Sequence, residues 1–161
     1  MKTFSLPLIR MYSRPVLEIN GYMALIDTGA EIPVCFLPRN VIGTVFRGEL
    51  LLKDQKIGTL GESVNADIFV FNQLTLGEMI FPGLKIAVPE KKKPEFDFLL
   101  SAPMFANMSV EMDFKTYYAT FSIGDQDSWV RNVIVKDRYG KEHVLCGDIP
   151  EISGPQQGQD F

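Results

Sequence analysis

Hydrophobic and polar residues alternate with a period of two along most of the chain, which is the pattern of half-buried β-strands. Pairs of such segments flank short turns, so we expect four hairpins, centred on Asn20-Gly21, Gly77-Glu78, Lys115-Thr116 and Tyr139-Gly140. The Asn-Gly pair is a strong hairpin signal, because both residues tolerate a positive φ. The only segment expected to form a helix is the short stretch SAPMFANM, residues 101–108. The pattern therefore predicts an all-β fold.

Length and composition narrow the class of protein. The chain has 161 residues, which suits one domain with a buried core. Its net charge of −4 gives no basic surface for nucleic acid, and no apolar run approaches the ~20 residues that span a membrane. Pro7, Arg10 and Arg14 interrupt the start of the chain, which makes it a poor secretory signal. Cys35 and Cys146 lie too far apart in the sequence to suggest a disulfide framework, so we expect a cytoplasmic location.

Several kinds of catalytic site are excluded by residue counts. His143 is the only histidine, and Cys146 follows it by three residues, which on a strand places the two side chains on opposite faces. One histidine and two distant cysteines match no zinc-site spacing, so we expect no metal. Neither a dinucleotide fingerprint nor a phosphate-binding loop is present. Among the kinds of catalytic site considered, one that uses Asp or Glu carboxylates therefore remains.

Asp27 is the carboxylate that stands out, because it ends the apolar run of residues 23–26. A buried, unpaired carboxylate is costly, so two interpretations are open. Asp27, Thr28 and Gly29 form either a plain strand-to-turn boundary or a site where Asp27 is placed for chemistry. The flanks favour chemistry: Gly29 permits close backbone approach, Thr28 supplies a hydroxyl, and Ala30 returns the chain to apolar packing.

The segment ALIDTGAEIPV resembles the active-site loop of the retropepsin-like aspartic proteases, the single-domain group that includes retroviral proteases. Other segments follow in the family's order. RPVLEINGYMALIDTGA resembles the hairpin leading into the loop, and KIGTLGESVNADIFVF lies where the family has its flap, a glycine-tipped hairpin that closes over substrate. The strand pair after the flap is resembled by LTLGEMIFPGLKIAV. The family's late segment, which contains a short helix, is resembled by FDFLLSAPMFANMSVEMDF. The resemblance covers roughly residues 15–123.

For the fold, the resemblance implies a closed barrel with one short helix, a flap hairpin and a C-terminal β extension. Residues 1–123 would form the protease domain, 124–152 a C-terminal β-hairpin extension of that domain, and 153–161 a flexible tail. We place the flap tip at Gly58, Thr59, Leu60 and Gly61, although this segment reads equally well as a simple turn. The chain departs from the family at Ser101, where Gly usually follows the apolar pair.

For function, the resemblance implies an aspartic endopeptidase with Asp27 as the catalytic residue and Thr28, Gly29 and Ala30 as its active-site loop. Two carboxyls about 3 Å apart share one proton and supply acid and base together, without metal or cofactor. Because the chain has a single Asp-Thr-Gly, the second Asp27 must come from a second copy in a homodimer. In the family the Thr28 hydroxyls hold the two loops in register, and a polypeptide substrate binds as an extended strand.

Two other hypotheses remain. The first is a catalytically inactive retropepsin-fold module for dimerisation or peptide binding, which Ser101 and the unmatched residues 124–161 favour. The second is an unrelated β-barrel binding domain, which would require the flanking similarities to be accidental.

Overall fold

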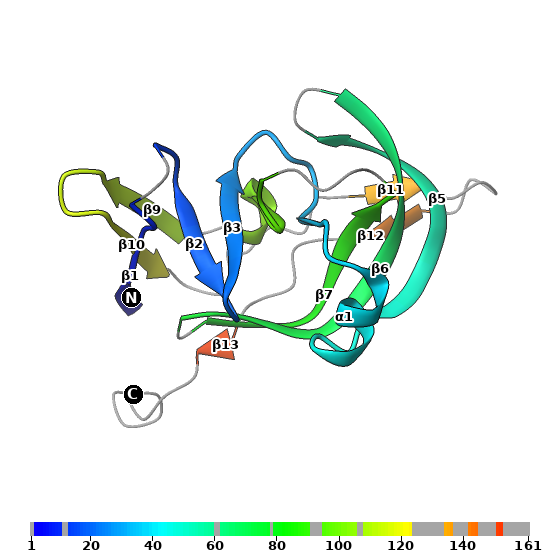
Figure 1. The fold of residues 1–161 in the computed structure, drawn as a ribbon, viewed down its shortest axis with the longest axis horizontal. Coiled ribbons are helices and arrows are strands. Elements are labelled where there is room, and N and C mark those ends of the chain that lie inside the picture. Colours follow the sequence, from blue (N-terminus) through cyan, green and yellow to red (C-terminus); the bar gives the residue numbers. More distant parts are fainter. Residues whose placement is uncertain are drawn as a thin grey trace.

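The computed structural model describes residues 2–10, 13–59, 62–77, 79–90, 95–105, 108–123, 134–136, 142–144 and 151–152. Most of the described chain is β-structure, so the predicted all-β class is confirmed (Figure 1). The strands are β1 (Lys2–Pro7), β2 (Val16–Ile19), β3 (Tyr22–Asp27), β4 (Val34–Cys35), β5 (Glu49–Thr59), β6 (Glu62–Leu76), β7 (Met79–Pro89), β8 (Phe98–Ser101), β9 (Met108–Asp113), β10 (Tyr118–Ile123), β11 (Ile134–Lys136), β12 (Glu142–Val144) and β13 (Glu151–Ile152).

The described strands form three sheets. The largest has the order β2-β3-β8-β4-β7-β6-β5, with β13 beside β7; β1-β10-β9 and β11-β12 form the other two. The large sheet ends at β2 and β5, which do not pair with each other, so the described strands do not close and the predicted closed barrel is wrong. The N-terminal strand β1 does not extend this sheet, because it pairs antiparallel with β10 from Lys2↔Ile123 to Pro7↔Tyr118.

The four hairpins expected from the alternating pattern are present as β2–β3, β6–β7, β9–β10 and β11–β12. In the first, Ile19 pairs with Tyr22, and the two turn residues Asn20 and Gly21 have φ of 50° and 84°. Asn and Gly adopt this left-handed backbone more readily than other residues, which is why the Asn-Gly pair predicted a hairpin turn. The β11–β12 turn and residues 153–161, the expected flexible tail, lie outside the described residues.

The short helix expected at residues 101–108 is present as a 3-10 turn, and the sequence did not predict the α-helix near residue 40. Segment 101–108 contains the single-turn 3-10 helix η1 (Ala102–Phe105), while the α-helix of the described chain is α1 (Arg39–Thr44). Within α1, Val41, Ile42, Gly43 and Thr44 are poor helix formers, so local propensity gives little signal. Ile42 is fully buried, and packing of this side chain against the core holds the short helix.

Two clusters of buried side chains lie on opposite faces of the central strands. Ile26 and Leu100 belong to the first cluster, whereas Leu25 and Leu99 belong to the second. Strands β3 and β8 are therefore covered on both faces, which explains why they read as continuous apolar runs. No helix in the described part of the chain has the length and apolar character needed to cross a membrane.

Candidate active site

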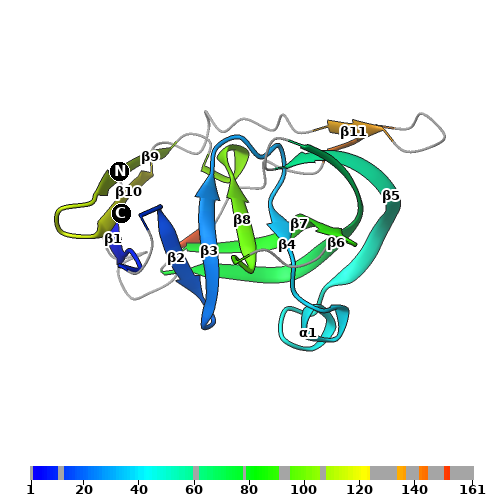
Figure 2. The same ribbon diagram turned by 45° about the horizontal axis from the view of Figure 1, so that its top comes forward.

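Asp27 is the last residue of β3, at the point where that strand leaves the core. Strand β3 runs parallel to β8, and the final pair of their register is Asp27↔Ser101. Figure 2 shows β8 between β3 and β4, the two strands that the Asp27 loop connects. The residues before Asp27 are buried, whereas Asp27 is half-buried. The fold thus carries an apolar strand to the surface and ends it on a carboxylate.

The loop after Asp27 is folded back on the carboxylate. The Gly29 amide donates to Asp27 Oδ1 at 3.0 Å, and the Ala30 amide donates to the Asp27 carbonyl oxygen at 3.1 Å. A Cβ atom at residue 29 would lie 3.4 Å from Asp27 Oδ1, close to ordinary van der Waals contact. Thr28 and Gly29 are exposed and Ala30 is buried. The loop therefore presents Asp27 and Thr28 on the surface of a single chain.

The β5–β6 hairpin reaches this loop. Ile57 of β5 is buried in the second cluster with Leu25, and Leu25 shares a strand face with Asp27 because the two residues are two positions apart. A Cβ atom added to Gly58 would lie 3.7 Å from Glu31 Oε1, on the segment that follows the Asp27 loop. The structure thus brings two separate sequence segments together, the one around Asp27 and the one around Gly58.

Of the residues expected at the hairpin tip, the structure describes two. Gly58 and Thr59 belong to β5, and Thr59 pairs with Glu62 at the start of β6. Leu60 and Gly61 lie outside the described residues. Glu31 was not predicted as a site residue, because a single Glu four positions after Asp27 belongs to no recognisable motif. The structure adds it to the site, since this exposed side chain lies near Gly58 of the hairpin.

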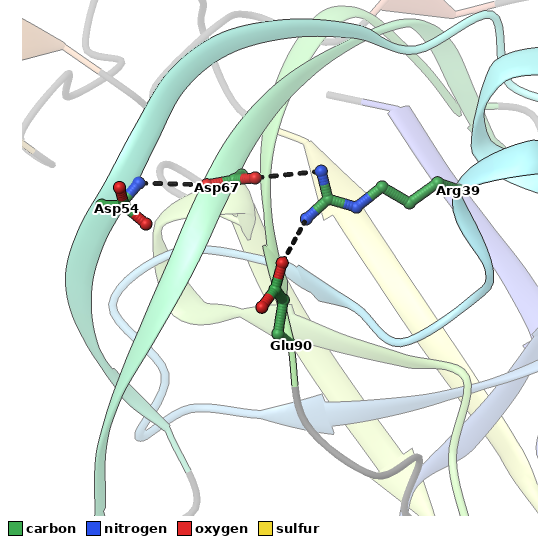
Figure 3. Close-up of polar contacts among 4 residues, drawn as sticks. All are labelled: Arg39, Asp54, Asp67 and Glu90. Atoms are coloured by element: carbon green, nitrogen blue, oxygen red, sulfur yellow. Dashed lines mark hydrogen bonds and ion pairs between the residues drawn. The ribbon is translucent and has the colours of Figure 1, made fainter.

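Polar contacts join the middle of this hairpin to helix α1 (Figure 3). Arg39 Nη1 lies 2.9 Å from Asp67 Oδ2, and Arg39 Nη2 lies 4.0 Å from Glu90 Oε1. The Asp54 amide donates to Asp67 Oδ1 at 3.0 Å. The Arg39 guanidinium also stacks over the Phe69 ring, 5.1 Å from its centroid. Asp67 on β6 is therefore held simultaneously by β5 and by α1.

Asp67 is stabilised as an anion by these donors. Burial raises the pKa of Asp67, but the Asp54 amide and the Arg39 guanidinium lower it by more, so the pKa lies below its ordinary value. The Asp54 amide is available because Asp54 has a φ of 54° within an irregular part of the β5–β6 register. Nothing in the sequence predicted this set of contacts, because the charged residues come from segments far apart along the chain.

Ser101, for which the resemblance predicted glycine, fits its strand. Its backbone is not among the positive-φ positions of the described residues, so a side chain is accommodated there without strain. The side chain is fully buried, and its Oγ has no hydrogen-bond partner among the described residues. A serine hydroxyl without a partner, beside Asp27 in the register, is unusual for a protein interior.

A buried carboxylate, Asp97, lies just before β8 and contacts β3. Asp97 is 6% exposed, its Oδ2 accepts the Met23 amide at 2.9 Å, and its own amide donates to the Met23 carbonyl. Asp97 precedes Ser101 by four residues, which at ~3.3 Å per residue places it about 13 Å from Asp27 along the sheet. Asp97 joins the chain before β8 to β3 and is too distant to share a proton with Asp27.

Cys35 lies near the Asp97–Met23 hydrogen bonds, and its thiol is unreactive. Its side chain is fully buried, and burial raises the pKa of the Cys35 thiol to about 12, with a smaller contribution from the Asp97 charge. A thiol held protonated in this way is a poor nucleophile. Asp27 therefore remains the better candidate for chemistry among these residues. No protein-family model and no curated protein matches the chain, so the geometry and chemistry of the site carry the functional assignment.

Proposed function

We propose that the chain is an aspartic endopeptidase of the retropepsin-like type, active as a homodimer. One observation carries the proposal: a core strand ends on the half-buried carboxylate of Asp27, and the loop that follows is exposed. A carboxylate held by its own loop amide and open on one side is suited to activate water. The resemblance of residues 15–123 to that family supports the same assignment.

The second carboxylate comes from a second copy. The chain has one Asp-Thr-Gly, and Asp97 lies too far along the sheet to serve. A twofold axis beside the exposed Thr28 and Gly29 would bring two Asp27 side chains together with a single self-complementary surface. The two carboxyls would then share one proton, one acting as base toward water and the other as acid toward the carbonyl oxygen.

The β5–β6 hairpin acts as the flap in this proposal. Gly58 reaches the segment after Asp27, so an extended peptide between hairpin and loop would pass the scissile bond over the carboxyls. The hairpin tip, Gly58, Thr59, Leu60 and Gly61, would donate and accept main-chain hydrogen bonds as an added strand does. A reducing compartment such as the cytoplasm suits the buried free thiol of Cys35.

The proposal is tested by incubating the purified chain with an unfolded protein mixture across a range of pH. We expect cleavage with an optimum on the acidic side of neutral, because a dyad works only while it holds one proton. A metal chelator should leave the rate unchanged, and a statine-type inhibitor, whose hydroxyl replaces the attacking water, should abolish cleavage. Loss of activity with a chelator and its return with zinc would contradict the mechanism. Absence of cleavage at every pH would favour the inactive dimerisation module.

A further inference from the structure

The side chain of Ser101 carries an inference that builds on the proposed function. It is completely buried, and no donor or acceptor among the described residues pairs with its Oγ. A buried hydroxyl without a hydrogen bond destabilises a protein, whereas alanine or glycine at the same position would avoid that cost. The presence of a hydroxyl here therefore calls for a partner that the resting contacts do not supply.

The register identifies the nearest suitable acceptor. Ser101 and Asp27 are directly paired across the parallel strands β8 and β3. Side chains of directly paired residues lie on the same face of a sheet, about 5 Å apart at their Cβ atoms. The neighbouring pair of the same parity, Leu25 and Leu99, lies in the second cluster, which confirms that alternate residues of the two strands share a face. The Ser101 Oγ is one bond from its Cβ atom and the Asp27 carboxylate oxygens are two bonds from theirs, so a hydrogen bond between them is compatible with a Cβ spacing of about 5 Å.

Asp27 has an oxygen free to accept. Its Oδ1 accepts the Gly29 amide, whereas Oδ2 has no hydrogen bond from the described residues. A carboxylate held by one hydrogen bond still rocks about its Cβ–Cγ bond, within the range of distances and angles that this hydrogen bond tolerates. A second donor on the sheet side would fix the plane of the carboxyl group and leave its solvent side open to water and to the partner carboxyl.

We propose that Ser101 is a positioning residue whose hydroxyl donates a hydrogen bond to Asp27 Oδ2 and fixes the carboxylate in the orientation that the dyad requires. The hydroxyl acts through Asp27 and touches neither water nor substrate. The retropepsin-like proteases usually have glycine at this position, so this hydrogen bond would distinguish the chain from them. The proposal rests on Asp27 being catalytic, and it makes the serine a contributor to activity rather than an impairment of it.

Ser101→Ala and Ser101→Gly test the proposal kinetically. Both remove the hydroxyl, and glycine is also the residue that a purely steric requirement would favour. We expect both variants to lose about tenfold in kcat with KM unchanged, the size expected for one charge-assisted hydrogen bond. Ser109→Ala, a matched change at an exposed strand position of β9, should keep the wild-type rate. A Ser101→Gly enzyme as active as wild type would overturn the proposal.

Thermal unfolding tests the same hydrogen bond without any need for activity. In the wild-type background, Ser101→Ala should lower Tm by about 3 °C, because Asp27 loses a donor. In an Asp27→Ala background the same change should leave Tm unchanged or raise it, because the hydroxyl then has no acceptor. If Ser101→Ala raises Tm equally in both backgrounds, the hydroxyl is unpaired and the proposal fails. A chain that cleaves nothing would refute the protease assignment, and the unfolding experiment alone would still decide the hydrogen bond.

Discussion

Asp27 and Ser101 face each other as the last pair of the parallel strands β3 and β8. The preceding pairs of these strands are buried apolar residues on both faces of the sheet. Two polar residues are therefore paired in the register where these apolar pairs end. Ser101 remains fully buried, whereas Asp27 is half-buried, so the pair spans the boundary between core and surface. Its position gives the site a rigid support, because β8 is itself held between β3 and β4.

The first prediction concerns Asp27→Asn. The amide keeps nearly the same shape but cannot share the proton of the dyad, so kcat should fall by about a thousandfold or more. The Gly29 amide can still donate to the side-chain oxygen, so the circular dichroism spectrum and Tm should stay close to wild type. Asp113→Asn, a change at an exposed carboxylate that accepts amides in the β9–β10 turn, is the matched control and should keep activity. An Asp27→Asn variant that cleaves at the wild-type rate would show that Asp27 is not catalytic.

The second prediction concerns Asp67→Asn, midway along the β5–β6 hairpin. The pKa of Asp67 is lowered in the folded chain, so its contribution to stability is present above the unfolded value of about 4 and is lost as pH falls through the lower folded value. At pH 7 the variant should lose about 1 kcal/mol, because the Arg39 contact is partly screened by solvent. The difference between variant and wild type should shrink at acid pH.

Urea unfolding from pH 7 to pH 3 measures this dependence. Glu95→Gln is the control, because Glu95 lies 3.5 Å from Arg14 with both side chains more than half exposed, and it should change stability by less than about 0.5 kcal/mol. A difference between Asp67→Asn and wild type that stays constant over this pH range would mean that the charge of Asp67 does not stabilise the hairpin.

The third prediction concerns Cys35. Because burial raises the pKa of its thiol to about 12, a disulfide reagent at pH 8 should leave it unmodified in the folded chain. The measurement is made on a Cys146→Ser variant, so that Cys35 is the only thiol. In denaturant one thiol per chain should react rapidly. Rapid reaction of the folded variant would show that the core around Cys35 opens readily.

Local pattern predicted the hairpins but not the way in which distant strands pair. Asn20-Gly21 fixes a turn by its own backbone preferences, and period-two alternation on either side fixes the register of β2 and β3. The large sheet instead depends on β8 passing between β3 and β4, which involves residues more than sixty positions apart. The prediction of a closed barrel was wrong for the same reason, since no local signal indicates that the end strands β2 and β5 do not pair with each other.

The candidate site was predictable as far as it is local. Asp27 was identified from the apolar run before it and from the loop residues after it, all within one short segment. The contact of Gly58 with Glu31, the Arg39–Asp67 contact and the unpaired hydroxyl of Ser101 depend on tertiary packing. Ser101 was noticed in the sequence only as a departure from glycine; its burial opposite Asp27 became clear from the fold.

The central claim is that the active site is shared between two chains, and mixing tests it most directly. Wild type is refolded with an equal amount of Asp27→Asn, and cleavage is measured per wild-type chain. Random pairing places half of the wild-type chains in dimers with a single aspartate, so activity per wild-type chain should fall to about one half, and further with excess variant. The same activity should fall on dilution below the dimer dissociation constant. Activity that simply follows the amount of wild-type chain, with no loss on mixing or dilution, would contradict the shared site.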